Sequence, residues 1–152
     1  MKVSDILRIK GGNPPFTIEP YSPLVDAVQT MADKDLGSLV VMEHDELVDM
    51  LTFREVIQAL MRNGGALGET TVRGAMDDHP LTCSPETALD EVRRMMIDSH
   101  ARYMPVIHSR QLVGVVSFYD VAKAVVDSQN FENKMLKAYI RDWPEGQSPD
   151  QG

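Results

Sequence analysis

The sequence predicts an α/β (α+β) fold in which two β-α-β-β-α units, related by a pseudo-twofold, pack sheet against sheet and are followed by a C-terminal helix. The first observation is an internal repeat: SLVVMEHDELVDMLTFREV, from Ser38, aligns without a gap with YMPVIHSRQLVGVVSFYDV, from Tyr103. The second is that apolar residues recur at helical spacing before and after this segment in both copies. The third is size, because neither copy is long enough to bury a sufficient core alone.

Each unit is expected to begin with a short strand and a helix. The strands are expected near residues 17–18 and 82–83. Ser-Pro pairs then predict the helix starts, with Ser22 or Ser84 as N-cap and the following proline as first helical residue. The apolar positions of these two helices are Leu24, Val28, Met31 and Ala32 in the first copy and Leu89, Val92, Met95 and Met96 in the second.

A hairpin and a second helix complete each unit. Strands are predicted at residues 38–43 and 47–52, and again at 103–108 and 111–117, each pair joined by a tight polar turn. The second helices should begin near Phe53 and Phe118. These features place one domain at residues 1–65, a second at 66–128 and a helical extension at 129–143. Because Pro144 ends the helical pattern, residues 144–152 are expected to be a disordered tail.

Composition limits the possible functions. The chain has 152 residues, of which 43% are hydrophobic and 25% charged, as in ordinary globular proteins. No apolar run approaches the ~20 residues that span a bilayer, and the N-terminus is too polar for a secretory signal, so we expect no membrane partner. The single cysteine, Cys83, favours a reducing cytoplasm. A net charge of −8 argues against nucleic-acid binding, but not against small anions.

The end of each hairpin reads as a strand turning into a helix, in DMLTFRE (residues 49–55) and GVVSFYD (residues 114–120). Thr52 with Glu55, and Ser117 with Asp120, have the spacing of a capping box. A helix N-terminus also attracts phosphate, and Asp120 has the right position to accept hydrogen bonds from ribose hydroxyls. Capping and ligand binding are compatible, so both interpretations stay open.

The doubled unit, the Gly-hydrophobic-x-Ser-x-x-Asp junction and the preceding YMPVI resemble a tandem pair of CBS (cystathionine β-synthase) domains, over about residues 1–127. This resemblance implies a regulatory module with two clefts between its sheets and no chemistry of its own. Members of the family commonly bind adenosyl ligands such as AMP, ADP, ATP or S-adenosylmethionine, and some bind NAD. The module usually forms a flat, disc-shaped dimer.

Site residues follow from this resemblance, mainly in the second copy. Ser117 would lie beside the phosphate, Asp120 would hold the ribose, and Gly114 would let the ligand approach the backbone. Arg102 either pairs with phosphate or is solvated. The residues expected around the adenine are Tyr103, Met104, Pro105 and Val106, with Thr82 on the facing strand.

The first copy departs from the pattern. Thr52 is kept, but Asp49 stands where the second copy has Gly114, and Glu55 stands in place of the aspartate. Asp49 would put negative charge close to a phosphate, which is unfavourable. We therefore expect the main site on the second copy and a weaker or empty site on the first. The weaker site would comprise Thr52, Glu55, Leu39 and Val40.

The helical extension carries an apolar stripe that needs a cover, because a lone helix of this length is marginal in water. The stripe either docks on a partner subunit or on its own module, or captures a separate protein. Its residues are Phe131, Met135, Leu136, Tyr139 and Ile140.

The sequence thus predicts a cytoplasmic, homodimeric, non-catalytic sensor of an adenosyl ligand that signals to a separately encoded protein. It requires no cofactor or metal. The alternative is a ligand-free interaction dimer that scaffolds a partner through its disc surface or C-terminal helix. A nucleotide hydrolase is disfavoured, because phosphoryl transfer would normally need a Mg²⁺ site and a positioned base.

Overall fold

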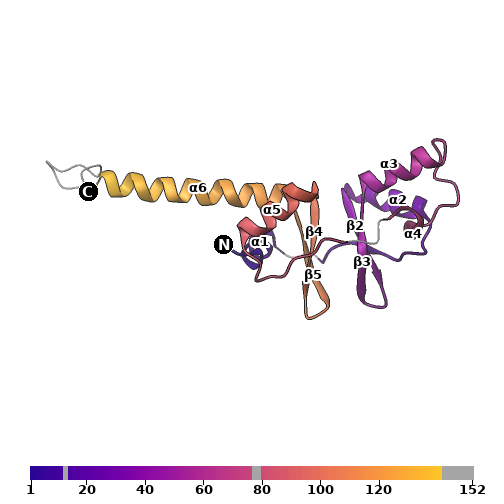
Figure 1. Ribbon diagram of the computed structural model, residues 1–152, viewed down its shortest axis with the longest axis horizontal. Coiled ribbons are helices and arrows are strands. Elements are labelled where there is room, and N and C mark those ends of the chain that lie inside the picture. Colours follow the sequence, from indigo (N-terminus) through magenta and orange to yellow (C-terminus); the bar gives the residue numbers. More distant parts are fainter. Residues whose placement is uncertain (12–13, 77–79, 142–152) are drawn as a thin grey trace.

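The computed structural model describes residues 1–11, 14–76 and 80–141, and has two sheets face to face at its centre with helices on the outer sides (Figure 1). The elements in chain order are α1 (Val3–Lys10), β1 (Thr17–Ile18), α2 (Leu24–Lys34), β2 (Ser38–Glu43), β3 (Glu46–Thr52), α3 (Phe53–Arg62), α4 (Val72–Ala75), α5 (Leu89–Ser99), β4 (Tyr103–His108), β5 (Gln111–Ser117) and α6 (Phe118–Arg141).

The sheets confirm the internal repeat. The first has strand order β1-β2-β3, in which β1 runs parallel to β2 and β3 runs antiparallel to it. The second consists of β4 and β5, and the predicted short strand at residues 82–83 contributes only a single parallel bridge, from Cys83 to Val106. Both hairpins pair in the same register, with Ser38 opposite Thr52 and Tyr103 opposite Ser117. Each register also shifts at the equivalent position of its hairpin.

The predicted starts of the first helices are wrong. α2 begins at Leu24 and α5 at Leu89, and neither helix has a side-chain cap from the preceding serine. Pro23 and Ala88, the residues just before these helices, instead form isolated antiparallel bridges, to Thr71 and Lys2 respectively. These bridges hold the chain extended until it reaches the first apolar residue of each helix, so a contact distant in sequence overrides the local capping signal.

The two cores exchange segments. α1 packs on the second unit, where Val3 and Ile6 join a buried cluster with Val92, Met104 and Val121. α4 packs on the first unit, where its buried residues join a cluster with those of α2, β2 and β3. The predicted domains, residues 1–65 and 66–128, follow chain order. In the structure, however, α1 belongs to the core of the second unit and α4 belongs to the core of the first.

α6 runs without a break through the predicted boundary after residue 128. Its first turns are held against the second unit by Val121 and Ala124, and the rest of the helix extends away from the body (Figure 1). None of the helices in the described part of the chain is long and apolar enough to cross a membrane. The predicted tail, residues 144–152, lies outside the described residues. The apolar stripe is exposed along its whole length, from 65% at Phe131 to 49% at Ile140, with Met135, Leu136 and Tyr139 in between.

Candidate ligand-binding clefts

The first strand-to-helix junction is a capping box, as predicted. The Thr52 amide donates to Glu55 Oε2 at 3.1 Å, and the Arg54 amide donates to Thr52 Oγ1 at 3.2 Å. The Thr52 hydroxyl also bonds the Glu55 carboxylate. The side chains that the sequence assigned to phosphate and ribose therefore hold each other at the start of α3.

The second junction is a capping box with an additional partner. The Ser117 amide donates to Asp120 Oδ2 at 2.9 Å, and the Asp120 amide donates to Ser117 Oγ at 3.0 Å. Lys10 Nζ, at the end of α1, donates to the same carboxylate oxygen at 2.9 Å. Burial by itself would raise the pKa of Asp120, but the Ser117 amide and the Lys10 ammonium outweigh it, so the pKa lies below its ordinary value of 3.8.

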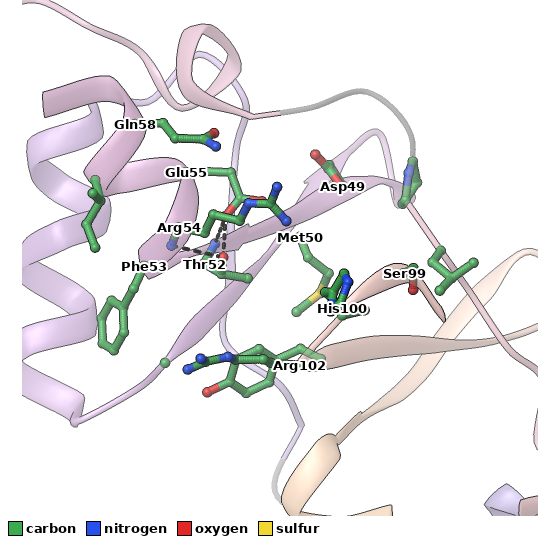
Figure 2. A pocket seen from close by; sticks show the side chains of 16 residues that line it. Asp49, Met50, Thr52, Phe53, Arg54, Glu55, Gln58, Ser99, His100 and Arg102 are labelled. Atoms are coloured by element: carbon green, nitrogen blue, oxygen red, sulfur yellow. Dashed lines mark hydrogen bonds between the residues drawn. The ribbon is translucent and has the colours of Figure 1, made fainter. Parts of the chain in front are cut away.

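The larger of two clefts, called here the first cleft, has a volume of about 720 Å³ and lies beside the start of α3. One wall is the first junction, which contributes Thr52, Arg54 and Glu55. The opposite wall is the turn from α5 to β4, with His100 and Arg102 (Figure 2). The first cleft thus combines the junction of the first copy with the helix-to-strand turn of the second.

The second cleft, of about 570 Å³, is built in the reverse way. It is lined by residues 113–115 in the middle of β5 and by residues 35–38, which are the turn after α2 and the first residue of β2. Residues 14–16 and two residues of α1, Leu7 and Lys10, also line it. Each cleft therefore needs both copies.

This crossing changes where the predicted residues lie. Arg102, expected beside the second junction, lines the first cleft with Thr52 and Glu55, whereas Gly114 lines the second. Ser117 and Asp120 line neither of these two clefts. The larger cavity thus adjoins the junction that the sequence ranked as weaker.

Several residues predicted to surround the adenine belong to the interior. Met104 is 0% exposed and belongs to the core cluster of the second unit. Leu39 is 1% exposed and belongs to the core cluster of the first unit. Pro105 is buried, and its carbonyl accepts a hydrogen bond from the Cys83 amide at 3.1 Å. Val40 lines the second cleft, and Thr82 is half-buried outside both clefts.

Tyr103 and Gly37 separate the two clefts, and both residues line both of them. A Cβ atom built on Gly37 would lie 1.9 Å from the Tyr103 hydroxyl oxygen, so no side chain fits at position 37 while Tyr103 keeps its position. This contact could not be predicted from the sequence, because it joins the turn before β2 to the first residue of β4 across the interface of the units.

The side chain of Leu7 lies directly over Gly114. A Cβ atom on Gly114 would lie 2.8 Å from Leu7 Cδ2, so the glycine makes room for α1. The absence of a side chain at position 114 therefore makes room for Leu7, and the approach of a ligand to this backbone stays a prediction.

Charges of both signs line the first cleft. Arg54, His100 and Arg102 supply positive or protonatable groups, and Asp49 and Glu55 supply carboxylates. Such a lining can pair cations with an anionic group while a carboxylate accepts from hydroxyls. No cluster of three or more potential metal ligands occurs within residues 1–11, 14–76 and 80–141.

Similar proteins share this architecture. The CBSX3 protein of Arabidopsis thaliana, described as a mitochondrial CBS domain-containing protein, is 29% identical over 147 residues, which cover 91% of this chain and 71% of that protein. A putative signal-transduction protein with CBS domains from Burkholderia ambifaria has a solved structure with a TM-score of 0.78 and 26% identity, covering 85% of this chain and 96% of that one.

Two other solved structures contain ligands and share the fold. The CBS domain pair of protein MJ0100, in complex with 5′-methylthioadenosine and S-adenosyl-L-methionine, has a TM-score of 0.72 and 23% identity, covering 84% of this chain and 98% of that one. CBSX2 in complex with AMP has a TM-score of 0.69 and 19% identity, covering 84% and 98%. The CBS domain family matches residues 3–62 and 72–127. The chain therefore belongs to the CBS domain family and carries two CBS domains in tandem.

Proposed function

We propose that this chain is a non-catalytic sensor that binds an adenosyl ligand in the first cleft and signals its presence to a separate protein. The observation that carries this proposal is the composition of the first cleft. Thr52 and Glu55 of one CBS domain and Arg102 of the other line the same cavity. A ligand held by both domains would bias how they pack, which is how binding becomes a signal.

Each part of an adenosyl ligand has a suitable partner in the first cleft. Glu55 is a carboxylate that can accept from ribose hydroxyls once it turns away from Thr52. The N-terminus of α3 and the guanidinium groups of Arg54 and Arg102 suit a phosphate. The ring of Tyr103 supplies a flat surface for a purine.

The ligands of similar proteins support an adenosyl compound. MJ0100 was solved with methylthioadenosine and S-adenosylmethionine, and CBSX2 with AMP. These molecules share the adenosine group and differ in the charge of what is attached to its 5′ carbon. Since cations and carboxylates both line the first cleft, we propose AMP as the first probe and S-adenosylmethionine as its cationic counterpart.

We also propose that the protein acts as a homodimer in the cytoplasm. The exposed stripe of α6 supports the dimer, because α6 extends away from its own module (Figure 1) and a second copy can cover it. The alternative function, a ligand-free interaction dimer, is favoured by one observation: both junction acids are already engaged, Glu55 by Thr52 and Asp120 by Ser117 and Lys10.

Thermal unfolding with AMP distinguishes the two functions. A ligand at ~100-fold its dissociation constant stabilises the folded state by about 2.7 kcal/mol, which raises Tm by about 5–11 °C for a chain of this size. We expect this rise in wild type and most of it to be lost in Arg102→Ala. Arg110→Ala, in the exposed β4–β5 turn, is the matched control and should keep it. If neither AMP nor S-adenosylmethionine raises Tm, the interaction dimer becomes the better account.

A further inference from the structure

The boundary between the two clefts is a contact between the two domains. Among the described residues, Gly37 and Tyr103 alone line both clefts. Gly37 lies in the turn before β2 of the first domain, and Tyr103 is the first residue of β4 in the second. A Cβ atom on Gly37 would lie 2.9 Å from Tyr103 Cζ as well as 1.9 Å from the hydroxyl oxygen, so the end of the ring lies directly on the glycine.

The backbone at position 37 does not itself require glycine. The described glycines with a left-handed φ are Gly11, Gly64, Gly65 and Gly68, and Gly37 is not one of them. Its φ therefore gives no reason to exclude an L side chain. The Tyr103 ring gives that reason, because it fills the space that a side chain would need.

The two backbones that meet here are each fixed by a sheet. Tyr103 lies opposite Ser117 in the ladder of the second sheet, and Ser38, the neighbour of Gly37, lies opposite Thr52 in the first. A Cβ atom at position 37 would therefore be accommodated mainly by rotation of the Tyr103 side chain. Because this side chain borders both clefts, a displaced ring would enter one of them.

The internal repeat does not duplicate this contact. In the alignment of the two copies, Ser38 corresponds to Tyr103, and Gly37 corresponds to Arg102. Arg102 lines the first cleft, and Ser38 lines the second. Only the first cleft therefore receives a guanidinium group and the aromatic ring from adjacent residues, a combination that suits a phosphate and a purine.

We propose that Gly37 is a positioning residue for the ligand of the first cleft. By carrying no side chain, it gives Tyr103 of the other domain the place from which the ring packs against a purine. This inference rests on the proposed function, because it takes the ligand of the first cleft to contain a purine. It adds a residue of the first domain to the purine site, and that residue acts through Tyr103 rather than through contacts of its own.

Isothermal titration with AMP tests the role of Gly37. Gly37→Ala should raise the dissociation constant at least about tenfold, the factor that corresponds to about 1.4 kcal/mol, because the displaced ring no longer offers the same surface. Gly74→Ala, in α4, is the matched control and should bind as wild type. A Cβ atom on Gly74 would have its nearest neighbour, Thr70 Cγ2, at 3.5 Å, which is an ordinary contact.

A second substitution shows whether the effect passes through Tyr103. Tyr103→Phe alone keeps the ring and should bind AMP nearly as wild type. Combined with Gly37→Ala, it should recover part of the lost affinity, since the closest approach grows from 1.9 to 2.9 Å when the hydroxyl is absent. Circular dichroism checks the fold of each variant. If Gly37→Ala alone does not fold, the double variant should still bind AMP more weakly than Tyr103→Phe.

The outcomes separate this inference from the proposed function. If wild type binds AMP and Gly37→Ala binds it equally well, the positioning role is overturned and the proposed function stands. A loss in Gly37→Ala that Tyr103→Phe does not reduce also overturns it, because the glycine would then act by another route. If wild type binds neither AMP nor S-adenosylmethionine, the proposed function fails and the positioning role fails with it.

Discussion

Asp120 connects two distant parts of the chain, the start of α6 and the end of α1, through one carboxylate. It caps α6 by accepting from the Ser117 amide and ties α1 to this junction by accepting from Lys10. Spacing predicts the cap, since Ser-x-x-Asp before an apolar helix is a local signal. The bond to Lys10 could not be predicted, because it depends on α1 crossing to the second unit.

The role of Asp120 in stability is expected to depend on pH. Because its pKa is lowered on folding, ionised Asp120 stabilises the fold above about pH 4, and this contribution is lost as the pH falls through the folded-state value. Asp120→Asn should lower the free energy of unfolding at pH 7 by about 1 kcal/mol, the usual cost of losing a cap. Urea unfolding should show this difference shrinking at pH 3. A difference that is equal at both pH values would contradict the assignment.

Cys83 is a small side chain in the core of the second unit, where the residue is 7% exposed. Burial raises its pKa from 9.0 to about 11. The thiolate is therefore scarce at neutral pH, and Cys83 acts as a packing residue.

At the scale of elements, periodicity and junction spacing predicted both hairpins, both second helices and the two capping boxes. They failed at the Ser-Pro pairs, where the isolated bridges Pro23–Thr71 and Lys2–Ala88 delay the start of each helix. A local cap signal has no information about a partner segment far along the chain. The hairpin turns could be predicted, because a two-residue turn depends on local conformation alone. Residues 44–45 and 109–110 adopt the left-handed conformations that suit the twist of such a turn.

α6 tests the proposed dimer. Met135 lies within the exposed apolar stripe, whereas Lys134 lies on the basic side of the same helix. Met135→Glu puts a charge into the proposed interface, so we expect at least a tenfold rise in the dimer dissociation constant, while Lys134→Glu leaves it nearly unchanged. Light scattering during size-exclusion chromatography should give twice the 17.0 kDa chain mass for wild type. A dimer that survives Met135→Glu would mean that another surface forms it.

At the scale of the whole molecule, the repeat explains why both clefts are shared. The exchange of α1 and α4 places each pre-strand helix on the opposite core, and each cleft pairs one junction with the turn of the other domain. The contact of Gly37 with Tyr103 lies at the centre of this arrangement and borders both clefts. Arg102 is close to Ser117 in chain order, which predicts one shared site, but in the structure Arg102 lines the first cleft with Thr52.

The asymmetry between the clefts also arises at this scale. The second junction keeps the better ligand pattern, but α1 covers Gly114 with Leu7 and occupies Asp120 with Lys10. The first junction has the poorer pattern, yet it opens into the larger cavity. The motif and the size of the cavity therefore favour different clefts, and the ranking of the two sites stays a prediction.

A crystal structure with AMP would show which cleft holds the ligand. We predict the adenosine in the first cleft, with its ribose bound by Glu55 and its phosphate near Arg102, while the Lys10–Asp120 pair stays intact. AMP bound only in the second cleft would contradict the proposed site.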